Sequence, residues 1–596
     1  MSPIRYQIIP RDPHAHLFEV RCTVDDPSPD GQRFRLPSWI PGSYLIREFA
    51  RQFIGVRAEA AGVPVAIEKE AKDTWRAAPA DGPLTVIASV HAFDLSVRTA
   101  YLDHARGYFN GPSVFLLPEG CDRRTCLLEI LPPAQEVFAH WRVATAFARD
   151  GAPAHGFGRY RAESYDELID HPVEMGDFAL VSFEAAGVAH EIAITGKHDA
   201  DLDRLARDLA RLCQWQIDFF GGEAPFDRYL FLINAVGEGY GGLEHRSSTS
   251  LLCRRDELPT RARTDIDDGY LHFLGLASHE YLHAWNVKRI KPAAFTPYDL
   301  SRESYTRQLW AFEGITSYYD DLALVRCGLI DAKRYLEVLG RGITGVLRTP
   351  GRFRQSIAEA SFDAWIKFYR PEAHSPNATI SYYGKGALVA LALDLSLREA
   401  QRGSLDTVMR TLWERFGKTG VGVPEDGIES IVCEQADDAM RAFFERYVNG
   451  TDDPPLETLL AAFGIEWHLR ASEGPNDRGG KPAKGPFPQS SIGATLGSDL
   501  RLQHVYSGAA AERAGLAPGD VLLALDGVRA SMEALATLLA RRSPGETIAV
   551  HAFRRDELLH VAVELDAALL DTCYLALATK APQRAVALRN AWLGAA

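Results

Sequence analysis

The spacing of apolar residues in this 596-residue chain changes near residue 200. Before that point, apolar and polar residues alternate in short segments separated by turn clusters, which predicts β-strands. The alternating apolar positions are Phe18, Val20, Cys22 and Val24, and Leu84, Val86, Ala88, Val90 and Ala92. After Asp201 the apolar residues follow a helical period, at Leu202, Leu205, Leu209 and Leu212. Because a chain of this length does not form one core, we predict a multidomain α+β protein.

The middle of the chain is predicted to be mostly helical up to about residue 465. A continuous apolar strand at residues 229–236 leads into a glycine-rich turn at residues 237–242. The expected helices then cover about residues 268–287, 303–327, 384–399 and 404–416. The aromatic stretch at residues 38–53 does not fit a plain strand. Its role, as a core plug or as part of a domain interface, stays open.

The last part of the chain is predicted to be a small separate module. Residues 471–487 are rich in Gly, Pro, Lys and Asp and hold little apolar content, which is typical of a linker. A helix beginning near Ser531 and strands at 547–554 and 558–565 then give a self-contained α/β pattern. We therefore predict a β-rich domain (1–170), a larger domain with a helical part (171–465), a linker (466–490), the small module (491–575) and a tail (576–596).

Composition argues against several classes of partner. The formal net charge of −14 disfavours nucleic acid and anionic membrane surfaces. No segment approaches the apolar length of a membrane span, and the first residues contain no apolar core of a signal peptide. We therefore expect a cytoplasmic protein, although a signal peptide already removed would leave the periplasm open. The eight cysteines are scattered without a CxxC pair, which favours reduced, structural thiols.

The segment from His279 to His283 reads His-Glu-Tyr-Leu-His, an HExxH motif. Histidines four residues apart share one helix face, so both rings can reach one zinc ion. Glu280 projects beside them, where a carboxylate can act as general base toward water. The motif therefore predicts metal-assisted hydrolysis, provided that a third ligand lies elsewhere in the chain.

Glu313 is the best candidate for that third ligand, at the start of a predicted helix some thirty residues later. Asp320 lies seven residues further on and shares its helix face, so it could accept the outer N–H of a zinc-bound imidazole. Both carboxylates could instead be solvated helix charges. The flanking aromatic residues favour a buried setting; they are Trp310, Phe312, Tyr318 and Tyr319.

Two further segments point to chemistry only in combination with the HExxH motif. Gly241 and Gly242 precede Leu243 and Glu244; glycines let a substrate backbone approach, and the carboxylate could hold a positive amino terminus. Taken alone, this segment fits a β-turn with a surface glutamate better. Tyr383 stands just before a helix that is apolar all round, where a phenol can donate to a developing oxyanion. Taken alone, it fits a core tyrosine.

Five segments together resemble the PDZ-bearing glycyl aminopeptidase family, one of the gluzincin metallopeptidases, which carry HExxH and a downstream glutamate ligand. They are HEYLHAWNVKRIKP, LWAFEGITSYYDD, GGLEHRSST, SWIPGSYLIREFARQF and the trailing PDZ-like module. The resemblance covers nearly the whole chain in the same order. It implies a β-rich amino-terminal domain, a thermolysin-like catalytic domain with a helical extension, and a PDZ domain at residues 491–575.

The resemblance also implies a site. It implies one Zn²⁺ per chain on His279, His283 and Glu313, with Glu280 as general base. The motif with Gly241 and Gly242 matches an amine-anchoring motif, which carries Glu244 over as the group that binds the substrate's α-amine. The family's catalytic tyrosine precedes an x-Lys-Gly sequence, which selects Tyr383 rather than Tyr382. The family prefers glycine and then alanine at the amino terminus of the substrate.

The chain departs from the family pattern at four places. The 29 residues between His283 and Glu313 are more than in the better-known gluzincin aminopeptidases. Ser317 stands four residues after Glu313, where thermolysin-type enzymes carry an acid, so Asp320 must take that role. His245 replaces an asparagine of the anchor motif. The carboxylate-binding loop of a PDZ domain is hard to recognise near Ile492.

These observations predict a zinc aminopeptidase that hydrolyses the amino-terminal residue of peptides and prefers glycine, then alanine. A first alternative is a zinc endopeptidase whose PDZ domain captures peptide carboxyl termini or unfolded chains. A second is an inactive scaffold that works through its PDZ domain. Blocking the substrate's amino terminus separates the aminopeptidase from the endopeptidase, because an anchor at Glu244 needs a free amine. The complete set of metal ligands argues against the inactive scaffold.

Overall fold

The computed structural model describes residues 2–485 and 487–594. Residues 1, 486, 595 and 596, which fall in the predicted β-rich domain, linker and tail, lie outside the described residues. The chain divides into two compact units. The first comprises Met1–Tyr305 and Trp413–Val423, and the second Thr306–Leu412 and Pro424–Ala596. Among the described helices, none combines the length and the apolar character that a membrane crossing requires.

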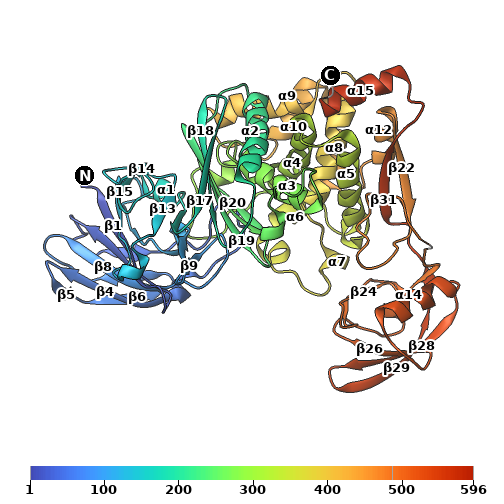
Figure 1. Ribbon diagram of the computed structural model, residues 1–596, viewed down its shortest axis with the longest axis horizontal. Coiled ribbons are helices and arrows are strands. Elements are labelled where there is room, and N and C mark those ends of the chain that lie inside the picture. The colour runs from blue at the N-terminus through green and yellow to red at the C-terminus, as the bar shows by residue number, and fades with distance from the viewer. Residues whose placement is uncertain (1, 486, 595–596) are drawn as a thin grey trace. The chain divides into compact units, whose positions relative to one another are not determined.

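The amino-terminal part of the first unit is built from β-sheets (Figure 1). Its largest sheet has the strand order β14-β15-β12-β1-β2-β8-β4-β5, in which β1 and β12 run parallel. The strands are β1 (Ile4–Asp12), β2 (Leu17–Val24), β4 (Phe53–Ala60), β5 (Val63–Val65), β8 (Leu84–His91), β12 (Cys126–Ile130), β14 (Ala148–Arg149) and β15 (Gly158–Ala162). The alternating apolar side chains of β2 and β8 are buried, which confirms the predicted strands. Burial of each Phe, Val or Leu side chain in this set stabilises the fold by about 2 kcal/mol relative to exposure.

Two four-stranded sheets and a short helix complete this β-rich part. One sheet contains β13 (Arg142–Thr145), β16 (Val173–Gly176), β10 (Arg106–Phe109) and β9 (Ala100–Leu102). The other contains β11 (Leu117–Pro118), β3 (Arg33–Arg35), β7 (Thr74–Ala77) and β6 (Ile67–Ala71). The helix is α1 (Tyr165–Leu168), which begins after Ser164.

A five-stranded sheet with two helices follows in the same unit, with the strand order β17-β18-β19-β21-β20. The strands are β17 (Ala179–Ala185), β18 (Val188–Thr195), β19 (Arg228–Val236), β20 (Gly241–Glu244) and β21 (Ser248–Arg254). Strands β18, β19 and β21 run parallel, and β19 is buried along most of its length. Helix α2 (Leu202–Phe219) contacts β17, and helix α3 (Asp268–Leu282) contacts β20 and β21. The sheet thereby positions α3, which carries the HExxH motif.

The second unit begins with helices packed around α8 (Gly384–Glu399), which is apolar and buried along most of its length. The other α-helices are α4 (Ile315–Arg326), α5 (Ala332–Leu347), α6 (Ile357–Phe362), α7 (Ser375–Ala378), α9 (Leu405–Leu412), α10 (Gly427–Gln435), α11 (Arg441–Phe444), α12 (Leu456–Ala462) and α15 (Gln583–Leu593). The helix expected at 303–327 differs from the prediction, because residues 303–308 are not helical and a π-helix, Trp310–Gly314, precedes α4.

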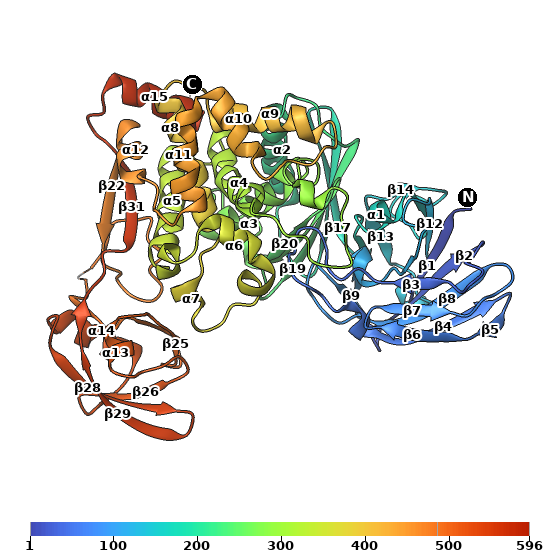
Figure 2. The same ribbon diagram turned by 180° about the vertical axis from the view of Figure 1, so that it is seen from behind.

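A strand pair and a small module complete the second unit. Figure 2 shows β22 (Ile465–Arg470) beside β31 (Thr572–Leu577), with which it pairs antiparallel next to α5 and α12. The module between them has its own apolar core. It contains β23 (Ser490–Ser491), β24 (Ala494–Leu496), β25 (Leu502–Val505), α13 (Ala510–Arg513), β26 (Val521–Leu525), β27 (Val528–Arg529), α14 (Met532–Arg541), β28 (Thr547–Arg554), β29 (Glu557–Glu564) and β30 (Asp566–Ala567).

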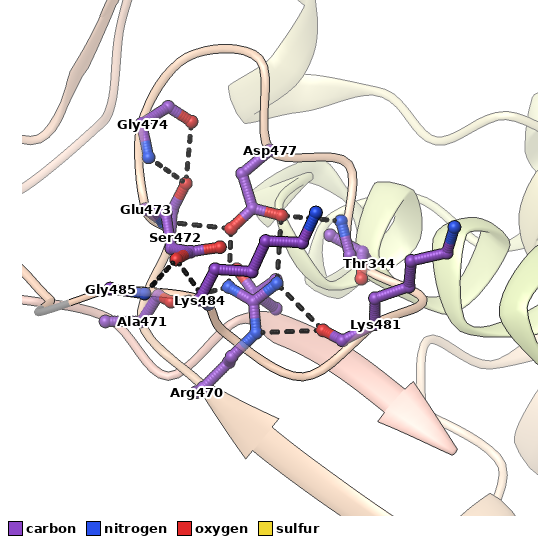
Figure 3. Close-up of polar contacts among 12 residues, drawn as sticks. Thr344, Arg470, Ala471, Ser472, Glu473, Gly474, Asp477, Lys481, Lys484 and Gly485 are labelled. Atoms are coloured by element: carbon purple, nitrogen blue, oxygen red, sulfur yellow. Dashed lines mark hydrogen bonds and ion pairs between the residues drawn. The ribbon is translucent and has the colours of Figure 1, made fainter. Parts of the chain in front are cut away.

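The segment predicted as a linker contains an ordered polar loop (Figure 3). The Arg470 guanidinium pairs with the Asp477 carboxylate and donates to the carbonyl oxygen of Lys481 at 3.0 Å. The same carboxylate accepts the backbone N–H groups of Glu473 and Gly479, both at 2.9 Å. Side-chain acceptors therefore fix a loop that contains few apolar residues.

Candidate active site

The HExxH motif lies at the carboxyl end of α3. The helix begins after Asp267, whose side chain accepts the backbone N–H of Tyr270 at 2.9 Å, and His283 follows its last residue. The ring centroids of His279 and His283 are 4.6 Å apart. The two imidazoles therefore lie on one face of the helix, one turn apart.

The hydrogen bonding of His283 suits a metal ligand. His283 is 2% exposed, and its Nδ1 lies 2.6 Å from the backbone carbonyl oxygen of Asn286. Because a carbonyl oxygen only accepts, Nδ1 carries a proton, and in the neutral ring Nε2 keeps its lone pair. Metal-binding imidazoles are oriented in the same way, by a hydrogen bond at the other ring nitrogen. Nε2 of His283 is therefore suited to bind zinc.

Strand β20 brings Glu244 next to Glu280. The ligand atoms of Glu244, Glu280 and His283 all lie within 4.8 Å of one another, and all three residues are buried. A Cβ at Gly242 would stand 2.1 Å from Oε1 of Glu280, so the backbone of β20 passes directly over the carboxylate of the motif. Two ionised carboxylates repel each other at such a separation. The arrangement therefore favours a positively charged group beside them.

The aromatic segment at residues 38–53, whose role the sequence left open, packs against Glu244 within the first unit. Trp39 is fully buried and donates from Nε1 to the carbonyl oxygen of Asp299 at 2.8 Å. Gly42 has a φ of +87°, and a Cβ there would lie 2.3 Å from Oε2 of Glu244. A stretch of backbone that only glycine permits thus lies directly against this carboxylate.

Glu313 belongs to the second unit, where it lies in the π-helix Trp310–Gly314 and is 2% exposed. Gly314 contacts α8 so closely that a Cβ would stand 2.7 Å from the Cα of Gly386. Single π-helical turns are frequent at functional sites. The close packing on α8 therefore fixes the backbone that carries the Glu313 carboxylate.

Tyr383 is the residue before α8, and its hydroxyl lies 3.2 Å from the hydroxyl of Tyr369. Phe368 stacks on the Tyr383 ring, with centroids 5.4 Å apart and an interplanar angle of 23°. Tyr382 is fully buried, and burial raises the pKa of its hydroxyl well above the ordinary value. Tyr383 is only partly buried, so it is the more accessible of the two neighbouring phenols.

Asp320 lies on α4 in the second unit and is partly buried. Its Oδ1 accepts the backbone N–H of Asp321 at 2.6 Å. Its predicted role toward a zinc-bound imidazole stays a prediction.

Three residues near these groups were not singled out from the sequence. Arg98 donates from Nη2 to the carbonyl oxygen of Gly242 at 3.4 Å, and no local pattern marks it. Gly42 lies inside the aromatic segment at residues 38–53, whose composition does not indicate a role for this glycine. Tyr369 precedes Tyr383 by 14 residues, and only the aromatic content of residues 365–369 could have indicated it.

Comparisons with known proteins identify related peptidases. A model of the peptidase M61 N-terminal domain matches residues 5–177, and a model of the M61 glycyl aminopeptidase matches residues 272–389. The crystal structure of an aminopeptidase N family protein from Idiomarina loihiensis is 40% identical in sequence, with a TM-score of 0.95. The match covers 99% of this chain and 100% of that one.

More distant solved structures match as well. An M1 zinc metallopeptidase from Deinococcus radiodurans is 15% identical, with a TM-score of 0.47, and the match covers 76% of this chain and 95% of that one. A mutant of the same enzyme bound to a Tyr-Ser-Ala substrate gives the same values. No curated protein matches the chain.

Proposed function

Because the chain belongs to the M61 glycyl aminopeptidase family and is a metallo-aminopeptidase, we propose that it uses zinc to remove glycine, and then alanine, from peptide amino termini. The observation that carries this proposal is the cluster of Glu244, Glu280 and His283. In it, a carboxylate that can hold an ammonium group neighbours the base and one imidazole of the HExxH motif. A free amino terminus held there would lie within reach of the hydrolytic residues.

We assign one zinc ion per chain to His279, His283 and Glu313. Two imidazoles and one carboxylate, with a fourth position open, are the ligands of a common class of catalytic zinc site. The bond from Nδ1 of His283 to Asn286 supports ligation through Nε2. Because Nδ1 of His283 already donates to Asn286, we assign Asp320 to accept the outer N–H of His279. Zinc, when bound, supplies Lewis acidity and lowers the pKa of water toward neutrality.

The remaining roles follow from the chemistry of each side chain. Glu244 holds the α-ammonium group of the substrate, which fixes the register so that one residue is removed. Glu280 takes a proton from the attacking water and passes it to the leaving amine. The Tyr383 hydroxyl donates to the carbonyl oxygen as negative charge develops there. Gly241 and Gly242 leave room for the substrate backbone.

The close approach of Gly42 to Glu244 supports the preference for small residues. A Cβ at Gly42 would already overlap the carboxylate. The backbone at this position therefore limits the space beside a bound amino terminus. Glycine, which has no side chain, and alanine, which has one methyl group, need the least room there.

The proposal is tested with amino-acid anilides and two substitutions. The enzyme should hydrolyse glycine and alanine anilides much faster than leucine or phenylalanine anilides. Glu280→Gln should abolish this activity, whereas Glu238→Gln, at an exposed position in the turn between β19 and β20, should not. An active Glu280→Gln enzyme, or equal rates on all anilides, would contradict the proposal.

A groove in the small module favours a second candidate, a zinc endopeptidase that captures peptide carboxyl termini with a PDZ domain. The groove has a volume of about 550 Å³ and lies between β24 and α14. Its apolar lining includes Ile492, Leu496, Met532, Leu535 and Leu539. Acetylating the amino terminus of a peptide substrate separates the candidates, because acetylation should stop the aminopeptidase and leave the endopeptidase active.

A further inference from the structure

A small cavity of about 20 Å³ lies beside Glu244 in the first unit. Four of its lining residues have buried polar atoms without a hydrogen-bond partner in the described part of the chain. Four of these atoms are Oε1 of Glu244, Oδ1 of Asn110, Nε2 of His245 and Oη of Tyr298; the fifth, Nδ1 of His245, lies 3.5 Å from Oδ1 of Asp170. Buried polar groups in native proteins are hydrogen-bonded with few exceptions. Four such atoms around one cavity therefore point to a bound molecule.

Four of the charged groups around the cavity, those of Asp166, Asp170, Arg246 and Lys288, pair with one another. Nζ of Lys288 lies 2.6 Å from Oδ1 of Asp170, and both side chains are buried. Oδ2 of Asp170 accepts the backbone N–H of Arg246 at 3.0 Å, and the Arg246 guanidinium also pairs with Asp166. Burial alone would raise the pKa of Asp170, but Lys288 and Arg246 hold it well below the ordinary value. These four charges balance, so among the described lining residues Glu244 is the charged group outside the pairs, and a small hydrogen-bond donor suits the cavity.

The protonation of the lining groups defines the occupant further. Burial raises the pKa of Tyr298, so its hydroxyl stays protonated and can donate. Burial lowers the pKa of His245, so its imidazole is neutral and offers one donor and one acceptor. The oxygens of Glu244 and Asn110 accept. A water molecule both donates and accepts, and it fits a cavity of this volume.

We propose that one water molecule is held in this cavity by Glu244, Asn110, His245 and Tyr298 and keeps the Glu244 carboxylate in position. The functional part of this inference rests on the proposed function, in which Glu244 binds the substrate's amine. Asn110, His245 and Tyr298 are then positioning residues, which act on the substrate only through Glu244. Asn110 follows β10 and Tyr298 lies after the HExxH segment, so two of the three come from outside the anchor motif.

The first test is a crystal structure of the full-length enzyme at a resolution that shows ordered water. We expect one density peak in the cavity, within hydrogen-bond distance of Oε1 of Glu244 and Oη of Tyr298. The peak should remain when glycine is soaked into the crystal. A cavity without density would overturn the inference. So would a peak that the amine of glycine displaces, because the cavity would then be part of the substrate site.

The second test measures kinetics with alanine anilide. Tyr298→Phe removes one partner of the water, so KM should rise about three- to tenfold while kcat changes little. The matched control is Tyr160→Phe, which removes a buried hydroxyl that donates to the carbonyl oxygen of Gly156. This control should lower the Tm and leave KM unchanged. A Tyr298→Phe enzyme with a lower Tm and an unchanged KM would contradict the positioning role.

The two proposals fail on different observations. An enzyme with Glu244→Gln and a wild-type KM would contradict the proposed function of this residue. The water itself is judged by the crystallographic density, which does not depend on activity.

Discussion

At position 242 the chain has room for a hydrogen atom and for little more. A Cβ there would stand 2.1 Å from Oε1 of Glu280, so Gly242→Ala must displace either β20 or the carboxylate. A displacement of about 1 Å near reacting groups can cost about 10²-fold in rate, and we expect a loss of kcat of that size. Gly237→Ala is the matched control, because its Cβ would meet only Nη1 of Arg255, at 4.0 Å. Equal activities of the two variants in an anilide assay would contradict this reading.

A second test at the scale of single residues concerns the pair of phenols. Tyr369 can orient the Tyr383 hydroxyl through their hydrogen bond of 3.2 Å. Tyr383→Phe should lower kcat by about 10²- to 10³-fold if its hydroxyl stabilises the oxyanion. Tyr369→Phe should lower kcat by less, and it should have no further effect in the Tyr383→Phe background. Full additivity of the two effects in this double-mutant cycle would show that Tyr369 acts independently of Tyr383.

The sequence predicts some of these residues and cannot predict others, for physical reasons. His279, Glu280 and His283 form a local motif because helical geometry alone sets how five consecutive positions face one another. Glu244 is a candidate because two glycines, Gly241 and Gly242, stand shortly before it in the chain. Tyr369 has no such local signal, since its contact with Tyr383 depends on how distant parts of the chain pack.

At the scale of elements, apolar periodicity predicts most helices and strands but not every boundary. Helix α8 has the predicted bounds because it is apolar all round and is buried. Residues 303–308 differ from the prediction, since the helix begins only at the π-helical turn that carries Glu313. The ordered loop at residues 471–485 has the composition of a flexible linker. Its order comes from hydrogen bonds to Asp477, which composition does not reveal.

This loop should show a dependence of stability on pH. Burial works to raise the pKa of Asp477, but hydrogen bonds from Arg470 and two backbone N–H groups lower it from 3.8 to about 2. Because the folded pKa lies below the unfolded one, the stabilisation is complete above about pH 4 and is lost as the pH falls toward 2. Asp477→Asn should therefore cost about 2 kcal/mol at pH 7 and progressively less below pH 4. Urea unfolding at several pH values measures this difference.

The control for this prediction is Asp556→Asn, at an exposed turn between β28 and β29. It should leave the unfolding free energy unchanged across the same pH range. A loss of stability for Asp477→Asn that does not depend on pH would indicate that the carboxylate contributes through packing and not through its charge.

At the scale of the whole molecule, the sequence indicated a multidomain α+β chain, and the β-rich amino-terminal part and helical middle region confirm this. The two compact units are not continuous stretches of the chain, because residues Trp413–Val423 belong to the first unit. Apolar periodicity shows which face of a segment is buried but not against which partner. The HExxH motif and the family resemblance together predicted the site residues, and the domain boundaries stay predictions.

Zinc should stabilise the whole chain as well as support catalysis. A metal ion that binds only the folded protein stabilises it by about 4 kcal/mol when free zinc exceeds its Kd a thousandfold. Dialysis against a chelator should therefore lower the Tm and abolish activity, and added zinc should restore both. Metal analysis should give one zinc per wild-type chain, and His283→Ala should lose both the metal and the response of the Tm. Glu280→Gln should keep both and still be inactive, because the base does not bind the ion. Zinc retained by His283→Ala would contradict the ligand assignment.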